Sequence, residues 1–254
     1  MNTKIFLAAV SHVKSSIVPY YKPHYILESF MDIKSNTKAT NEYIKWCLSA
    51  DMFLLDSGAF TFMNKSKKSK EFTEEMFYDY LESYIDFINK WDIKYFFELD
   101  LDCVIGYEKV KLVREYLEYK TNKKCIPVWH KDRGIDDFIN TCKKYDYIAI
   151  GGIASKEIKK SEHNLLYELC DIAHSYNCKV HGLGYLPLEV LNSRNCPFDT
   201  VDGTSWQGHM RQKCYYLDEN NNMKVFKNDD RYWKAISYDC FGNWTDFSKI
   251  IEKE

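Results

Sequence analysis

Short, almost purely apolar runs alternate with amphipathic segments along most of this chain, and the alternation limits the folds that it can adopt. The runs lie at 5–10, 52–55, 95–99, 126–129, 147–150, 180–183 and 198–201. Such runs are typical of strands that are buried on both faces. Because helical segments separate them, we expect the strands to pair in parallel through right-handed crossovers.

The segments between the runs have the spacing of amphipathic helices. Helices are predicted at 107–119, 135–144 and 164–176, and an earlier one begins at Thr73, which can cap it. The apolar stripe of this earlier helix recurs at intervals of three and four residues and comprises Phe77, Tyr80, Leu81, Tyr84, Ile85 and Ile88.

These strand–helix units predict an α/β fold, a TIM-type (β/α)8 barrel with a short C-terminal extension and no zinc subdomain. The length of 254 residues suits a single barrel domain, with its core at about 4–206 and a hairpin and helix in 207–254. The strand still missing is expected within 20–45 or beyond Trp206. A doubly wound open sheet is the alternative, but no glycine-rich phosphate fingerprint follows the first run.

Composition excludes some classes of function. The net charge is -2, so a nucleic acid partner would need a local basic patch. The nine cysteines include no CxxC pair, which favours reduced thiols in the cytoplasm. The first run is too short for a signal peptide or a membrane span, so no membrane association is expected.

Aspartates end several of the apolar runs: Asp56, Asp100, Asp102, Asp199 and Asp202. At the end of a barrel strand, a carboxylate lies at the mouth, where active sites form. Asp100 and Asp102 flank Leu101, so they face the same way and repel each other. They could hold a base with several N–H donors, or a metal, whereas capping of loop amides is the structural alternative.

Other candidate residues follow the same strands. Gly58, and the pair Gly151 and Gly152, either turn the chain or let a ligand approach the backbone. His130 and His181 also come at strand ends, as structural or functional histidines. The basic residues that could hold a phosphate backbone are Lys65, Lys67, Lys68, Arg211 and Lys213.

In this order the motifs resemble the tRNA-guanine transglycosylase superfamily, and most closely its small DNA-directed members from phages and bacteria, which put 7-deazaguanine bases into DNA. The sequence DSGAF at 56–60 is similar to the family's aspartate-serine-glycine-glycine-phenylalanine loop. FELD at 97–100 is similar to the strand that ends in its base-holding aspartate, and GGIA at 151–154 to its glycine-glycine-leucine-alanine loop.

The resemblance implies a role for each matching residue. Asp202 would be the nucleophile and Asp199, three residues earlier, a supporting residue. Asp56 would act as acid and base, and Asp100 would hold the base, with Asp102 as the weaker match. The other implied base-binding residues are Ser57, Gly58, Phe60, Gly151, Gly152 and His130, where His130 stands near a family glutamine, and His181 would be supporting.

The implied reaction replaces guanine in a nucleic acid with a free 7-deazaguanine base through a covalent aspartyl–sugar intermediate, without cofactor or metal. DNA is favoured over tRNA because Cys196, Cys214 and Cys240 are too widely spaced for the zinc site of the tRNA enzymes. A tRNA-guanine transglycosylase stays an alternative. So do a metal-dependent TIM-barrel hydrolase, with ligands among Asp56, Asp100, His130, His181 and Asp202, and a non-catalytic nucleic-acid-binding accessory subunit. A homodimer or a partner protein is compatible with each.

Overall fold

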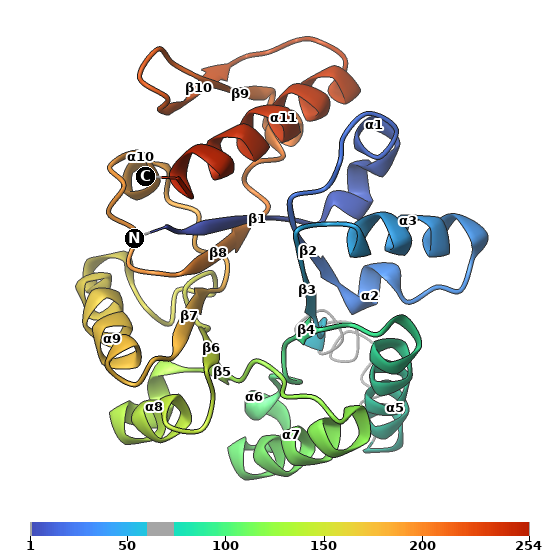
Figure 1. The fold of residues 1–254 in the computed structure, drawn as a ribbon, viewed down its shortest axis with the longest axis vertical. Helices are drawn as coiled ribbons and strands as arrows, with labels where there is room; N and C mark the ends of the chain where they lie inside the picture. The colour runs from blue at the N-terminus through green and yellow to red at the C-terminus, as the bar shows by residue number, and fades with distance from the viewer. Residues whose placement is uncertain (1, 60–73, 254) are drawn as a thin grey trace.

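Eight parallel strands form one curled sheet, with helices around its outside (Figure 1). The computed structural model describes residues 2–59 and 74–253. The strands are β1 (Lys4–Ala8), β2 (Tyr25–Ser29), β3 (Met52–Asp56), β4 (Tyr95–Phe96), β5 (Val128–Trp129), β6 (Tyr147–Ile150), β7 (Lys179–Gly182) and β8 (Thr200–Gly203). Their order in the sheet is β4-β3-β2-β1-β8-β7-β6-β5, so the fold is α/β and TIM-barrel-like, as the alternation of the sequence predicted.

The sheet is not closed as a full barrel, because its two edge strands meet only at a seam. At this β4–β5 seam, Phe97 and Ile126 form an isolated parallel bridge. The N–H of Val128, which would continue the ladder to the carbonyl of Glu98, donates instead to the Glu98 side chain at 2.6 Å. The predicted closure is therefore reduced to one backbone bridge supplemented by side-chain contacts.

The two faces of the strands belong to two apolar layers. Phe6 and Ala8 of β1 lie in an inner cluster with side chains of β2, β3, β5 and β6. Ile5 and Leu7 alternate with them and pack outward into the layer beneath the helices. Burial on both faces explains why the runs in the sequence are nearly continuous in apolar residues.

Ten helices are described around the sheet. They are α1 (Lys14–Ile17), α2 (Phe30–Ile33), α3 (Lys38–Leu48), α5 (Glu74–Trp91), α6 (Asp102–Ile105), α7 (Tyr107–Thr121), α8 (Gly134–Cys142), α9 (Asn164–Ser175), α10 (Leu188–Asn192) and α11 (Trp233–Ile251). Short turns are η1 (Val10–Val13), η2 (Lys131–Arg133), η3 (Lys160–Glu162) and η4 (Gly208–Arg211). The predicted stripe of α5 is buried throughout, and α7, α8 and α9 match their predicted ranges to within a few residues. Thr73 lies outside the described residues.

Strand boundaries differ from the prediction in several places. The eighth strand is β2, within the range 20–45. The first strand ends at Ala8 instead of continuing to residue 10, because Ala9 adopts a φ of 59°. β4 is shorter than 95–99, and β8 begins at Thr200 instead of residue 198.

The C-terminal extension is a hairpin followed by a long helix. β9 (Lys213–Leu217) pairs antiparallel with β10 (Met223–Lys227), as the sequence predicted. Helix α11 (Trp233–Ile251) lies within the range 207–254, where the sequence predicted a helix, and it includes Gly242, a residue that ordinarily disfavours a helix. A Cβ at Gly242 would overlap the hydroxyl of Tyr21, so close packing of α11 against the end of α1 explains this glycine. No described helix combines the length and the apolar composition that crossing a bilayer would need.

Candidate active site at the carboxyl ends of the strands

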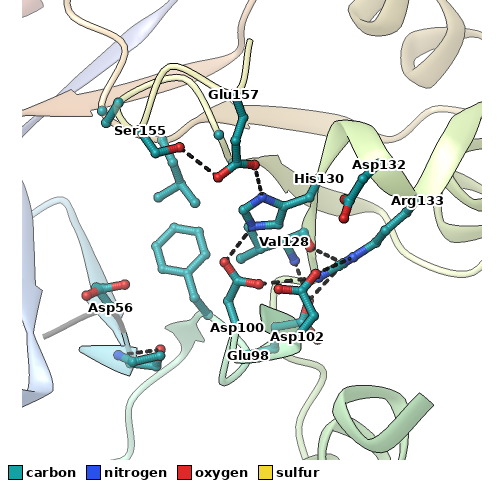
Figure 2. Close-up of a pocket in the computed structure, with 18 of the residues that line it drawn as sticks. Asp56, Glu98, Asp100, Asp102, Val128, His130, Asp132, Arg133, Ser155 and Glu157 are labelled. Atoms are coloured by element: carbon teal, nitrogen blue, oxygen red, sulfur yellow. Dashed lines mark hydrogen bonds and ion pairs between the residues drawn. The ribbon is translucent and has the colours of Figure 1, made fainter. Parts of the chain in front are cut away.

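A cavity of about 870 Å³ lies at the carboxyl ends of the strands. Residues from the ends of β3 to β7 line it, including Asp56, Asp100, His130 and Glu157. Figure 2 shows Asp56 on one side and a connected group of Asp100, His130 and Glu157 on the other. A ligand between the two sides would therefore contact carboxylates at opposite edges.

Asp56 ends β3 and shares the phase of Met52 and Leu54, which face the inside of the curled sheet. Its Oδ2 accepts the N–H of Gly58 at 3.0 Å. Burial raises the pKa of Asp56 to about 6 against this hydrogen bond, with further contributions from the negative charges of Asp202 and Asp100. A carboxyl group of this pKa can both give and take a proton near neutrality.

The loop that follows Asp56 is tightly packed. Gly58 has a φ of 70°, and a Cβ there would lie 2.7 Å from Met31 and 2.8 Å from Ser29. The hydroxyl of Tyr80 donates to the carbonyl of Ser57. Glycine is thus required at position 58, and the predicted pocket residues Ser57 and Gly58 hold Asp56 in place.

His130 follows β5 and connects two carboxylates. Its Nε2 lies 2.7 Å from Oδ2 of Asp100, and its Nδ1 lies 2.9 Å from Oε2 of Glu157. Burial alone would lower the pKa of His130, but the hydrogen bonds and negative charges outweigh it and raise this pKa to about 9. At neutral pH, His130 is therefore an imidazolium that donates to both carboxylates.

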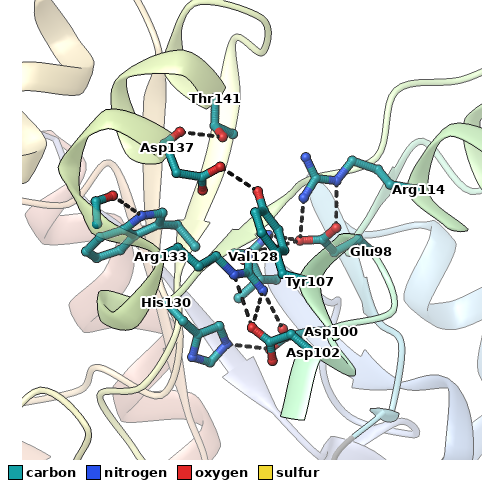
Figure 3. Close-up of polar contacts among 12 residues, drawn as sticks. Glu98, Asp100, Asp102, Tyr107, Arg114, Val128, His130, Arg133, Asp137 and Thr141 are labelled. Carbon is teal, nitrogen blue, oxygen red and sulfur yellow. Dashed lines mark hydrogen bonds and ion pairs between the residues drawn. The ribbon is translucent and has the colours of Figure 1, made fainter. Parts of the chain in front are cut away.

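Arg133 lies between Asp100 and Asp102 (Figure 3). Its guanidinium donates to Oδ2 of Asp102 at 2.7 Å and lies 3.3 Å from Oδ1 of Asp100. The ring of Tyr107 stacks on it at 4.1 Å, and the Tyr107 hydroxyl donates to Asp137 at 2.8 Å. The repulsion predicted between the two aspartates is thus offset by a fixed cation that the sequence analysis did not identify.

Glu98 forms the floor of the same group, with its side chain fully buried. Arg114 donates to it from Nε at 2.6 Å and from Nη2 at 3.2 Å. Burial raises the pKa of Glu98, and the charge of Arg114 opposes this rise. A charged residue inside an apolar run predicts a buried ion pair, so the sequence did contain a signal for it.

Asp202 lies in β8, beside the cavity. Its Oδ1 accepts the N–H of Gly184 at 2.7 Å and lies 3.2 Å from Nε2 of His181. His181 is fully buried, and its Nδ1 contacts the Thr200 hydroxyl at 2.7 Å. Gly184 lines both the main cavity and a smaller one of about 360 Å³. His181 and the N–H of Gly184 therefore fix the orientation of the Asp202 carboxylate.

Gly151 and Gly152, predicted to turn the chain or to let a ligand approach, both line the cavity. The N–H of Gly151 is bonded to the carbonyl of Trp129 at 2.9 Å. A Cβ at Gly151 would lie 2.8 Å from Nε2 of His130, and one at Gly152 would lie 2.9 Å from Oε2 of Glu157. The two glycines leave the space that these side chains occupy.

Other predicted site residues lie elsewhere. Asp199 is at the opposite end of β8 from the cavity, where it binds His174 at 2.8 Å and the N–H of Val180 at 2.8 Å. It therefore connects α9, β7 and β8 instead of supporting Asp202 directly. Arg211 is exposed in η4 and Lys213 is half-buried at the start of β9. The remaining predicted residues, Phe60, Lys65, Lys67 and Lys68, lie outside the described residues.

A metal fits this group poorly. Donor atoms of Asp100, Asp102 and His130 lie within 4.8 Å of one another, a spacing that could hold an ion. However, Arg133 already contacts both carboxylates, so a cation bound there would have to displace the guanidinium.

Comparisons with known proteins add a fold but no activity. No family model matches this chain, and no curated protein does. Among solved structures, the chain is similar to a protein from Aquifex aeolicus VF5 that is described only as "Structural study of Project ID from Aquifex aeolicus VF5". The TM-score is 0.50 at 8% identity, over 99% of this chain and 91% of that one. A likeness at this identity shows a common fold alone.

Proposed function

We propose that this protein is a base-exchange transglycosylase that replaces guanine in DNA with a 7-deazaguanine derivative. The observation that supports this most is the position of Asp56, Asp100 and Asp202 at the carboxyl-end side of the curled sheet; burial raises the pKa of Asp56 to about 6, and the charges of the other two add to this rise. Base exchange at a glycosidic carbon uses carboxyl groups in distinct protonation states. The motifs that resemble the transglycosylase superfamily contribute the same three residues, and the fold would be a reduced (β/α)8 barrel without the zinc subdomain.

In the proposed reaction, Asp202 attacks the anomeric carbon of a guanosine unit and the bond from that carbon to the base nitrogen breaks. The contacts to Gly184 and His181 both use Oδ1, so Oδ2 is the attacking oxygen. Asp56 protonates the departing guanine and then removes the ring proton of the incoming 7-deazaguanine. The nitrogen of that base attacks the sugar carbon, the aspartyl–sugar bond breaks, and Asp202 returns to its carboxylate form.

The remaining residues hold the base and the polymer. Asp100 accepts hydrogen bonds from N–H groups of the base, and the cavity takes a nucleotide that has left its stack. Arg211 and Lys213, with the lysines that follow Asp56, would neutralise phosphates. We favour DNA over tRNA because the cysteines are spaced too widely for the zinc site of the tRNA enzymes.

Incorporation of labelled guanine by the purified protein, with duplex DNA and unmodified tRNA in parallel, tests the proposal. Label in DNA is the expected result. Label in tRNA alone would keep the chemistry and change the polymer. Absence of label from both, with wild type also failing to trap a covalent nucleic-acid adduct on a denaturing gel, would refute base exchange.

A metal-dependent hydrolase is the second candidate, since the donor atoms of Asp100, Asp102 and His130 lie close together. It predicts a stoichiometric divalent ion in the purified protein and an activity that chelators abolish. The transglycosylase predicts base exchange that is insensitive to chelators.

A further inference from the structure

We propose that Glu157 and His130 form a positioning pair that fixes the orientation of the Asp100 side chain, so that its free acceptor positions face the cavity and favour heterocycles with adjacent N–H donors. The proposal rests on the function proposed above and adds Glu157, which no motif of the sequence indicated. Neither residue is assigned a chemical step.

A continuous chain of hydrogen bonds supports the pair. It runs from the Ser155 hydroxyl to Oε1 of Glu157 at 2.8 Å, from Oε2 of Glu157 to His130 at 2.9 Å, and from His130 to Asp100 at 2.7 Å. About half of the Glu157 side chain is exposed, whereas that of His130 is 14% exposed. The chain therefore leads from the rim of the cavity to its base-holding carboxylate (Figure 2).

The backbone is shaped for this chain. A Cβ at Gly151 would meet the ring of His130, and a Cβ at Gly152 would meet the carboxylate of Glu157. Gly152 also has a φ of 79°, which favours glycine independently, so the fit to His130 rests on Gly151.

The charges fix what Asp100 can bind. The imidazolium of His130 donates to Oδ2, and Arg133 lies 3.3 Å from Oδ1, near the outer limit of a hydrogen bond. These two donors fix the orientation of the Asp100 side chain, and Oδ1, which has only the longer contact, can accept a further hydrogen bond. An acceptor held in this way binds the adjacent N–H groups of guanine and leaves the bare ring nitrogen of adenine unpaired, which is costly in a buried site.

The test measures the pKa of His130 by NMR and the affinity for free guanine by calorimetry in the same set of variants. Glu157→Gln should lower the pKa of His130 by about one unit or more and weaken guanine binding about tenfold. His130→Gln, which keeps a donor but removes the charge, should weaken it at least as much and reduce the preference over adenine. Glu162→Gln is the matched control, because Glu162 lies on the same loop and pairs at the surface with Lys131.

The guanine affinity and the pKa of His130 each test the proposed role of Glu157. Wild-type guanine affinity in Glu157→Gln would overturn the proposal, as would an unchanged pKa of His130. If wild type binds no guanine at all, the proposed function fails, and the NMR shift alone then decides whether Glu157 holds the imidazolium.

Discussion

At the scale of single residues, the cavity contains two groups whose charge changes on either side of neutrality. The pKa of Asp56 is about 6 and that of His130 is about 9. Between these values Asp56 is mostly ionised and His130 is charged. The two edges of a bound base would therefore meet a proton acceptor on one side and a charge-stabilised carboxylate on the other.

The pKa of His130 predicts a loss of stability at alkaline pH. Because the folded value lies above the ordinary 6.5, the stabilisation is complete below pH 6.5 and is lost as pH rises through about 9. It amounts to at most about 3 kcal/mol. Denaturant unfolding of wild type and His130→Gln between pH 6 and pH 10 should give curves that converge with rising pH, and parallel curves would contradict the assignment.

The raised pKa of Asp56 predicts that its ionised side chain lowers the stability of the folded protein while it serves the proposed reaction. Its raised pKa means that ionisation disfavours the folded state, so stability is lost as pH rises through about 6. Asp56→Asn should raise the free energy of unfolding at pH 8 by about 1–2 kcal/mol, allowing for partial solvent screening, and should abolish base exchange. A variant that is less stable than wild type at pH 8 would show that Asp56 is not strained by its surroundings.

Asp202→Asn tests the nucleophile. The amide keeps the size of the side chain, so we expect a melting temperature close to that of wild type. Base exchange should fall by at least about 10³-fold, and no covalent adduct should form. Loss of exchange together with loss of the folded state would instead indicate a structural role for the contact with Gly184.

At the scale of elements, the sequence predicted where the strands lie better than it predicted the residues at which they begin and end. The buried runs located seven strands, since apolar residues on both faces leave a clear signal. Ala9 ended β1 early through its positive φ, and the Glu98 side chain took the N–H of Val128 at β5, and no apolar pattern records either feature. Among the site residues, the strand-end positions of Asp56, Asp100 and Asp202 were predictable. Arg133 and Glu157 were not, because they reach the cavity from loops whose path depends on the folded chain.

Gly242 in helix α11 allows a test of whether close packing against Tyr21 outweighs the higher helix propensity of alanine. Alanine in place of a helical glycine ordinarily stabilises a protein by about 1 kcal/mol. Gly242→Ala should instead destabilise by about 1–2 kcal/mol, because its Cβ would overlap the Tyr21 hydroxyl. The double variant with Tyr21→Phe should recover much of the loss, and thermal unfolding of the three variants checks this. A more stable Gly242→Ala single variant would contradict the close approach.

At the scale of the whole molecule, the seam depends on one buried carboxylate. Glu98→Ala would leave Arg114 buried without a partner and the N–H of Val128 without its acceptor. We expect a loss of about 3–5 kcal/mol in the free energy of unfolding. Glu162→Ala, which breaks an exposed pair with Lys131, should cost less than about 1 kcal/mol by the same denaturant measurement. Equal losses in the two variants would show that the contacts of Glu98 at the seam contribute no more to the free energy of unfolding than an exposed ion pair.

The β4–β5 seam also lies beneath the proposed base-binding group. Asp100 follows β4 and His130 follows β5, so their hydrogen bond adds to the few contacts that join the two edge strands of the sheet. A base that binds Asp100 adds to the interactions across this seam. Ligand binding and closure of the sheet are therefore thermodynamically linked, so that each stabilises the other. Amide exchange at Glu98, Ile126 and Val128 should therefore slow when the cavity fills, and any change that loosens this edge should weaken binding by the same free energy.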